Sequence, residues 1–208
     1  MSDISLVNVS KTYKNGYSAV KNFKMCIRDR LKDSLKLIES PGDTEELAEE
    51  ANPDDTTYLI PGFTGLGAPY WDSRAVGMYY GMTRLTGKAE LVKAGLESIA
   101  YQITDVVLAM EEESGIPIGE LRADGGPTRN RYLMQFQSDI AQAVVQVPDS
   151  EELSGIGPAY AAGLALGVWD GRIFDKLKRV TYEPHMDGTL RDRKYQGWKS
   201  AVETILTR

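Results

Sequence analysis

Cysteine and histidine are nearly missing from this sequence, which has one of each, Cys26 and His185, among 208 residues. A single cysteine excludes a disulfide framework, and the two residues together exclude a cysteine- or histidine-rich metal site. We expect His185 to lie in a surface loop. No apolar run approaches the roughly 20 residues that a membrane-spanning helix needs. The polar start, MSDISLVNVS, does not resemble a signal peptide, so we expect a cytoplasmic protein without membrane insertion.

Several catalytic motifs are also absent. The phosphate-binding pattern G-x-x-x-x-G-K-[ST] does not occur, because LTGKAE lacks both the hydroxyl residue and the upstream glycine. There is no G-x-S-x-G motif and no histidine placed for a catalytic triad. The net charge of −6 and a pI near 5.0 argue against nucleic acid as a partner. An anionic small molecule can still bind to backbone N–H groups at helix ends.

What is present is ordinary globular composition, with 42% hydrophobic and 26% charged residues. The clearest helix is predicted over 88–113, ended by Gly115 and Pro117. Its apolar residues recur at steps of three and four and predict one buried stripe: Val92, Leu96, Ile99, Ile103, Val106 and Met110. A shorter helix is predicted over 31–38, with Leu31, Leu35 and Ile38 on one face. An acidic helix capped by Asp43 or Thr44 should follow it.

Strands and helices alternate along the rest of the chain. Strands are predicted over 4–9, 18–25, 56–63, 75–82, 120–124, 144–148 and 179–183. Helices are predicted over 128–141, over 154–168 and at the C-terminus. This alternation predicts an α/β fold, with a layered sheet and flanking helices.

One turn has the residues of a possible anion site. A strand ends at Asp124, Gly125 and Gly126 make the turn, and a helix follows. Glycines without Cβ atoms let a ligand approach the backbone, and the helix would direct free N–H groups at it. Asp124 could hold a metal-bound water or a hydroxyl. The residues alone favour a plain strand-to-helix connection, with Arg129 and Asn130 on the helix surface.

Two other segments are rich in glycine. In SGIGPAYAAGLALGVW, small residues indicate either close approach to a nucleotide or tight helix packing, and packing is favoured for most positions. The loop PGFTGLGAPYWD is too long for a simple hairpin turn. Its aromatic residues Phe63, Tyr70 and Trp71 could line a cleft or pin the loop to the core, and the residues alone favour pinning.

Residues 31–208 resemble the C-terminal domain of glycerol kinases, within the sugar and polyol kinase family. The resemblance runs through LKDSLKLI, IPGFTGLGAPYWDSRAVGMYYGMTR, LESIAYQITDVVLAMEEESG, LRADGGPTRNRYLMQFQSDI, AYAAGLALGVW and YQGWKSAV. It implies a mixed sheet in an actin-like (ribonuclease H-like) ATPase fold. The chain departs from the usual pattern at Gly95, at Arg131 and in SGIGPAY.

The resemblance further implies ATP or ADP with Mg²⁺ as cofactor. Gly126 and Asn130 match nucleotide-contacting positions, and Gly125 and Asp124 belong to the same turn. The catalytic base and the site for glycerol or a related polyol lie in the family's N-terminal part, so no catalytic residue or metal ligand is assigned here. The parent enzyme is expected to be a homo-oligomer. We expect the 208-residue chain alone to be inactive. A nucleotide-binding remnant and an interaction partner of a transporter ATPase remain alternatives.

Residues 1–24 resemble a different family, the sugar-importer type of ABC-transporter ATPase. Tyr13 matches the aromatic residue that stacks on adenine there, yet the phosphate-binding loop that should follow is absent. The segment MCIRDR fits neither family. We therefore expect a chimeric chain, with an N-terminal β segment and junction over 1–30 that is not an independent domain. The kinase-like domain would occupy 31–208.

Overall fold

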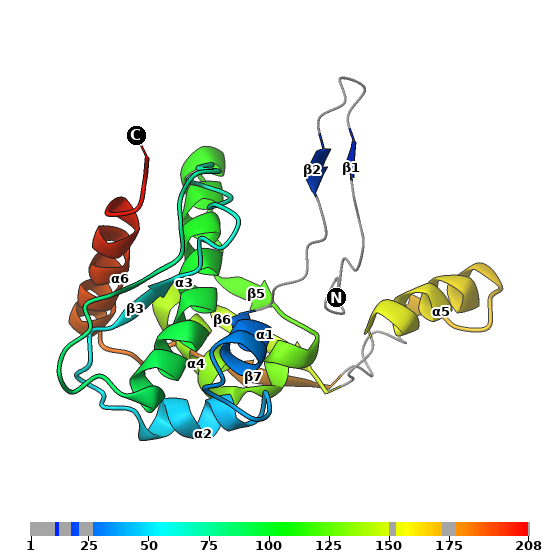
Figure 1. Ribbon diagram of the computed structural model, residues 1–208. Helices are drawn as coiled ribbons and strands as arrows, with labels where there is room; N and C mark the ends of the chain where they lie inside the picture. The colour runs from blue at the N-terminus through cyan, green and yellow to red at the C-terminus, as the bar shows by residue number, and fades with distance from the viewer. Residues whose placement is uncertain (1–10, 13–17, 21–26, 150–152, 172–177, 208) are drawn as a thin grey trace.

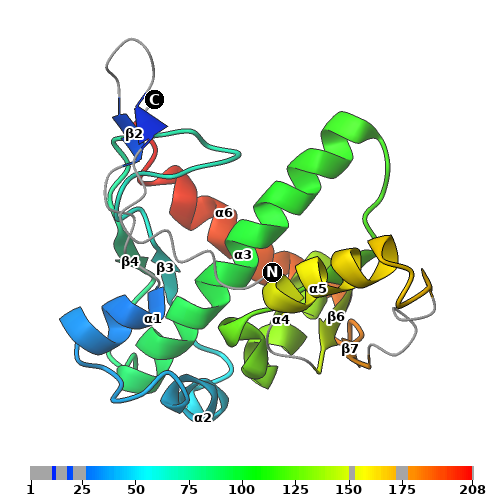
Figure 2. The ribbon, with the colours of Figure 1, turned by 90° about the vertical axis from the view of Figure 1, so that its right-hand side faces the viewer.

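The computed structural model describes residues 11–12, 18–20, 27–149, 153–171 and 178–207. Figures 1 and 2 show the arrangement from two sides. The elements in chain order are β1 (Lys11–Thr12), β2 (Ser18–Val20), α1 (Ile27–Asp29), the π-helical η1 (Arg30–Ser34), α2 (Asp43–Glu50), β3 (Tyr58–Ile60), β4 (Met78–Tyr80), α3 (Lys88–Ser114), β5 (Glu120–Arg122), the 3-10 helix η2 (Gly126–Arg129), α4 (Arg131–Ala141), β6 (Val144–Pro148), α5 (Leu153–Ala165), β7 (Arg179–Tyr182) and α6 (Gly188–Glu203).

The sheet that carries the predicted turn is mixed. β5 pairs with β6 in parallel, and β6 pairs with β7 antiparallel. β3 and β4 form a separate antiparallel pair, and so do the short strands β1 and β2. The predicted alternation is confirmed, although the strands near 58 and 78 do not join the larger sheet. The predicted strand over 4–9 and Cys26 fall outside the described residues.

Helix α3 is the centre of the packing and contacts α4, α2 and β3. Its Tyr101 is almost fully buried and stacks on Trp198 of α6, with ring centroids 5.1 Å apart. Phe136 of α4 meets the same tyrosine edge-on at 5.4 Å. Aromatic pairs in these geometries add to the energy of apolar burial. This cluster joins α3, α4 and α6, which lie close together in Figure 2.

The predicted apolar stripe of α3 is correct only in its first half. Val92 and Leu96 are fully buried, but Ile103, Val106 and Met110 are 42%, 36% and 55% exposed. Beyond Leu96 the buried face carries Tyr101, Thr104 and Asp105 instead. The reason is that α6 offers hydrogen-bond donors there, so a polar residue is buried in place of an apolar one. Among the described helices, none is long and apolar enough to cross a membrane.

The helix predicted over 31–38 begins and ends four residues earlier than predicted. It starts at Ile27 and ends at Ser34, so Leu31 and Ile38 are buried while Leu35 is 43% exposed. Leu31 packs against α3 at Gly95, where an added Cβ would lie 3.0 Å from its Cδ1 and 3.5 Å from Ile27 Cγ2. The glycine at this position therefore accommodates the helix over 27–34.

The capping prediction for α2 is wrong. The N-cap is Gly42, and it makes no side-chain capping bond. The Asp43 carboxylate turns back and accepts hydrogen bonds from Ser40 Oγ and from the Glu39 and Ser40 amides. These bonds, first the one from the Ser40 hydroxyl, lower the pKa of Asp43 to about 2. The acidic side chain thus stabilises the preceding turn.

Candidate functional site

The predicted turn lies where β5 ends and contains Asp124, Gly125 and Gly126, and Asn130 follows it at the start of α4. Asp124 and Gly125 are half-buried, and Gly126 is exposed. Ligands of open α/β sheets bind outside the carboxyl ends of the strands. The turn therefore occupies the part of the sheet where ligand sites occur.

Backbone geometry explains why the turn needs Gly125. Its φ of 95° and ψ of 176° lie in a region that only glycine adopts readily. The Gly125 carbonyl accepts from the Thr128 hydroxyl at 2.7 Å and from the Thr128 amide at 3.0 Å. Gly126 then opens η2, and the first amides of a helical segment have no partner inside it. The Gly126 N–H is thus among the amides for which η2 itself provides no acceptor.

Asn130 is buried, which differs from the predicted position on the helix surface. It is the N-cap of α4, and its Oδ1 accepts from the Leu133 amide at 2.8 Å. Its Nδ2 donates to Thr44 Oγ1 at 3.1 Å, and Thr44 is itself fully buried in α2. The residue is 8% exposed. Asn130 therefore fixes the start of α4 and joins it to α2, whatever it contributes to a ligand.

The side chain of Arg131 extends to Glu45 of α2. The guanidinium Nε lies 3.3 Å from Glu45 Oε1, and the side chain is 82% exposed. The Arg131 amide donates to the other carboxylate oxygen of Glu45 at 3.2 Å. An exposed pair of this kind contributes little stability. The arginine that departs from the family pattern is thus paired with α2.

The glycine-rich loop is pinned to the core by one of its three aromatic residues. The Tyr70 hydroxyl donates to Asp105 Oδ2 at 2.9 Å. Phe63 lies under the Arg30 guanidinium, 4.9 Å from ring centroid to Cζ. Trp71 is 79% exposed and has a φ of 52°, so it does not pin the loop. The pinning prediction is confirmed for Tyr70 and wrong for Trp71.

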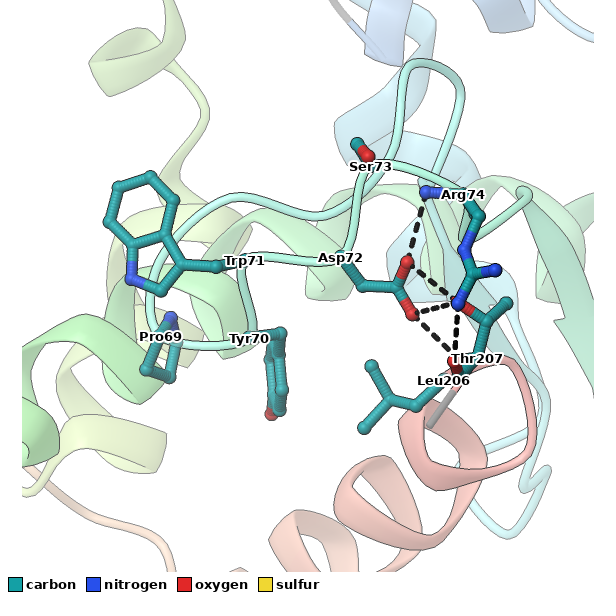
Figure 3. A pocket seen from close by; sticks show the side chains of 8 residues that line it. All are labelled: Pro69, Tyr70, Trp71, Asp72, Ser73, Arg74, Leu206 and Thr207. Carbon is teal, nitrogen blue, oxygen red and sulfur yellow. Dashed lines mark hydrogen bonds between the residues drawn. The ribbon is translucent and has the colours of Figure 1, made fainter.

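A cavity of about 420 Å³ lies between this loop and the C-terminal end of the described chain (Figure 3). Asp72 holds its wall together by accepting from the Thr207 amide at 2.6 Å and from the Thr207 hydroxyl. Arg74 donates to the Thr207 carbonyl oxygen at 2.7 Å. The backbone bond from Thr207 is the largest cause that lowers the pKa of Asp72 to about 2. Because Asp72 and Arg74 use these groups to bond Thr207, this wall holds the loop against the C-terminal residues.

Helix α5 projects from the rest of the fold (Figure 1), and most of its small residues are exposed. Tight packing is observed at Gly163, which is buried where the Trp169 ring folds back onto the helix. Trp169 also meets Tyr160 edge-on at 5.5 Å. The packing prediction holds for Gly163, while Gly157, Ala161 and Ala162 are exposed. His185 is exposed in the loop before α6, as predicted.

Sequence reasoning missed a buried charged cluster between α3, α4 and α6. Lys93 and Glu97 lie one turn apart on α3 and are 7% and 4% exposed. Tyr132 donates to Glu97 Oε1 at 2.6 Å, and Lys194 Nζ lies 3.7 Å from the same oxygen. The available signal was the pair of charges inside an otherwise buried helix face. In the described residues, no group of three or more His, Cys, Asp or Glu side chains is arranged to hold a metal.

Comparison with known proteins identifies the fold and the family. Residues 16–166 match the C-terminal domain of the FGGY family of carbohydrate kinases. The chain is 48% identical to the glycerol kinase of Petrotoga mobilis, over 83% of this chain and 35% of that protein. It is 46% identical to the glycerol kinase of Aliivibrio fischeri, with the same coverage. The chain thus spans about a third of the length of these relatives.

Solved structures agree with the sequence relatives. The structure of Plasmodium falciparum glycerol kinase with ADP is 34% identical, with a TM-score of 0.77, over 86% of this chain and 36% of that one. A ligand-bound xylulose kinase from Lactobacillus acidophilus shares the fold at 18% identity, with a TM-score of 0.73, over 97% of this chain and 44% of that one. The predicted actin-like ATPase fold is thereby confirmed. The chain belongs to the FGGY family of carbohydrate kinases and contains the C-terminal domain of that family.

Proposed function

We propose that this chain is the ATP-binding C-terminal part of a glycerol kinase, which transfers the γ-phosphoryl group of ATP to a hydroxyl of glycerol. The observation that carries the proposal is the turn at Gly125 and Gly126, at the carboxyl end of β5. It occurs in a chain whose relatives named glycerol kinase are 44–48% identical to it. A related glycerol kinase was solved with ADP, which supports a nucleotide as the ligand.

The turn would bind the nucleotide phosphates through its backbone. Gly126 N–H can donate to a phosphate oxygen, and the absent Cβ atoms leave room for close approach. Asn130 would act mainly by holding the start of α4, since its amide already bonds Leu133 and Thr44. Binding through backbone amides needs no basic patch. This mode fits a chain with a net charge of −6.

The residues of the turn also fit Mg²⁺ bound together with the nucleotide. Mg²⁺ in kinases is held by phosphate oxygens and one or two carboxylates, and several waters remain on it. Asp124 provides a carboxylate beside the turn, two residues after the end of β5. The ion, when bound, neutralises charge on the transferring phosphate. Asp124 would orient the ion through water, and it is not proposed as the catalytic base.

The base and the polyol site are expected in the part of the relatives' length that this chain does not match. The intact enzyme is expected to be a homo-oligomer. By itself the 208-residue chain should bind nucleotide without phosphorylating glycerol. A coupled assay for ADP release in the presence of glycerol tests this expectation. Turnover above the rate of a protein-free blank would overturn it.

Isothermal titration with Mg–ADP tests the proposed site. Gly126→Ala should weaken binding at least severalfold, because a methyl group would crowd the phosphates. Gly119→Ala is the matched control, since a Cβ at Gly119 has no atom within 4 Å and the residue precedes the same strand. Loss of ADP binding in Gly126→Ala alone supports the site. Equal affinities of the two variants for ADP would refute it.

We also propose that residues 1–24 originate from an ABC-transporter ATPase fragment joined to the kinase part. The support is their resemblance to the first strands of such ATPases, without the phosphate-binding loop. The family match begins at residue 16, within this segment. Ile27 packs beside Gly95 of α3, so contacts with the kinase part begin before residue 31. One long DNA read across the codons for 15–40 tests the join. A read that joins both sides in one natural molecule would contradict an accidental join.

A further inference from the structure

A second cavity, about 680 Å³ in volume, lies between α2, α3, α4, α6 and β7. We call it the lysine pocket, after Lys93 of α3 and Lys194 of α6, which both line it. Of the described residues, none from Asp124 to Asn130 contributes to its wall. The pocket is therefore separate from the proposed nucleotide turn. Its size is that of ordinary small-molecule sites.

Lys93 is a buried cation with spare hydrogen-bonding capacity. It is 7% exposed, and within the described residues its ammonium donates to one acceptor, the Asn52 carbonyl oxygen, at 3.1 Å. Burial, opposed by the charge of Glu97, lowers the pKa of Lys93, and the positive charge of Lys194 lowers it further. An ammonium has three N–H donors, and removing it from water without hydrogen-bond partners is energetically unfavourable. An anion beside Lys93 would satisfy both needs.

A single buried carboxylate serves the two lysines. Glu97 Oε1 lies 3.7 Å from Lys194 Nζ and also accepts from the Tyr132 hydroxyl at 2.6 Å. Asp55 and Glu90 also act on the Lys93 charge, and Glu49 and Asp139 line the wall, so the pocket has no net excess of positive charge. What it has in excess is N–H donors, because the Lys93 ammonium donates to one acceptor among the described residues.

The other acidic groups in the wall are occupied or lie at the rim. Asp139 Oδ1 accepts from the His185 and Met186 amides at 2.7 and 3.1 Å. Glu49 is exposed. Arg131, also at the rim, is paired with Glu45. Among the described residues of the wall, the unused N–H donors of Lys93 are therefore where an incoming acceptor group gains most.

Part of the wall is apolar. Phe136, Met186 and Leu190 line the pocket together with Ala48. Lys194 Nζ lies 5.7 Å from the centroid of the Phe136 ring, so the cationic and apolar parts of the wall adjoin. Pockets with apolar walls and a few convergent polar groups are the usual form of small-molecule sites.

We infer that the lysine pocket binds a small organic anion, a monophosphate or carboxylate carried on an apolar body. Lys93 and Lys194 contact the anionic group, and the Tyr132 hydroxyl lies beside it. Phe136, Met186 and Leu190 contact the body. This site is additional to the nucleotide site and does not depend on the proposed kinase activity.

Calorimetric titration of the full chain with phenyl phosphate and with benzoate tests this site, and phenol is the neutral comparison. Both anions should bind saturably and more tightly than phenol, and the tighter of the two identifies the preferred group. Lys93→Met should weaken anion binding about tenfold or more, as expected for a lost charge-assisted hydrogen bond. Lys88→Met is the matched control, because Lys88 is exposed at the start of the same helix and does not line the pocket.

A second variant keeps the test decisive if Lys93→Met fails to fold. Leu190→Trp keeps both lysines and fills part of the cavity, so it should also abolish binding of the anions. Saturating Mg–ADP should leave phenyl phosphate binding unchanged. Equal binding of phenol and phenyl phosphate, unchanged binding in Leu190→Trp, or displacement of phenyl phosphate by ADP would each overturn the assignment.

Discussion

The Tyr70 hydroxyl donates a 2.9 Å hydrogen bond to Oδ2 of Asp105, which joins the glycine-rich loop to the middle of α3. The same carboxylate accepts from Tyr195 at 2.6 Å and from Trp198 Nε1 at 2.8 Å, both on α6. Asp105 is only 3% exposed. A buried carboxylate with three donors is satisfied, and it fixes the relative positions of the loop and the two helices.

Asp105→Ala should therefore be strongly destabilising. It leaves the buried Trp198 Nε1 and the half-buried hydroxyls of Tyr70 and Tyr195 without their acceptor, and an orphaned buried donor costs about 1–3 kcal/mol. We expect a loss of at least about 3 kcal/mol in the free energy of unfolding, measured by urea denaturation. Glu112→Ala, at an exposed position of the same helix, should change this free energy by no more than about 0.5 kcal/mol. Equal effects of the two substitutions would refute the role of Asp105.

Two glycines of α6 should respond to alanine in opposite directions. A Cβ at Gly197 would meet Tyr58, with the ring Cζ 2.7 Å away, whereas a Cβ at Gly188 has no atom within 4 Å. Overpacking costs about 1–3 kcal/mol, while alanine in an open helical position gains up to about 1 kcal/mol over glycine. Thermal melting should show Gly197→Ala less stable and Gly188→Ala unchanged or more stable. A gain in Gly197→Ala would contradict the close contact with Tyr58.

Asn130 should matter for stability independently of any nucleotide. Asn130→Ala removes the cap of α4 and the bond to Thr44, which should lower the free energy of unfolding by about 1–2 kcal/mol. Arg131→Ala breaks only an exposed ion pair and should cost no more than about 0.5 kcal/mol. Urea denaturation without ADP distinguishes the two. If Asn130→Ala keeps full stability and loses only ADP affinity, the capping role is wrong.

Alkaline pH should destabilise the fold through buried tyrosines. Burial is the main cause that raises the pKa of Tyr58 and that of Tyr79 to about 12, from 10.0. A group whose folded pKa is raised stabilises the fold fully below its unfolded pKa, and that stability is lost as pH rises toward the folded pKa. The free energy of unfolding should thus fall between about pH 10 and 12, by at most about 1.4 kcal/mol per pH unit for each tyrosine.

Tyr79→Phe tests the assignment of this alkaline loss. Tyr79 donates to the Leu91 carbonyl oxygen at 3.3 Å, so the phenylalanine variant loses one weak bond at neutral pH. Above pH 10 its stability should decline less steeply than that of the wild-type chain. Parallel curves for the two proteins between pH 10 and 12 would show that Tyr79 does not contribute.

Elements whose boundaries depend only on neighbouring residues were predicted correctly from the sequence. The helix predicted over 88–113 is observed over 88–114, because a long periodic segment followed by Gly115 leaves little choice of boundaries. The turn at Gly125 and Gly126 was also found from sequence, since a glycine pair between a strand and a helix has few uses. The resemblance to the kinase family then indicated that this turn contacts the nucleotide.

Features that depend on distant partners were not predictable from local patterns. Asn130 caps α4 because that helix begins at Arg131, three residues later than expected, and because Thr44 of α2 lies beside it. The burial of Asp105 in place of the predicted apolar stripe requires α6, about 90 residues away. The lysine pocket likewise needs α2, α3, α4 and α6 together. The apolar periodicity of one helix does not show which distant helices will pack against it.

The most direct test of the central claim is an amide ¹H–¹⁵N chemical-shift map of the chain titrated with Mg–ADP. Binding at the proposed turn predicts saturable shifts of Gly125, Gly126 and Thr128, with the amides of Lys93 and Lys194 unchanged. If the shifts occur at the lysine pocket, or if saturating ADP leaves the turn unperturbed, the turn is not the nucleotide site.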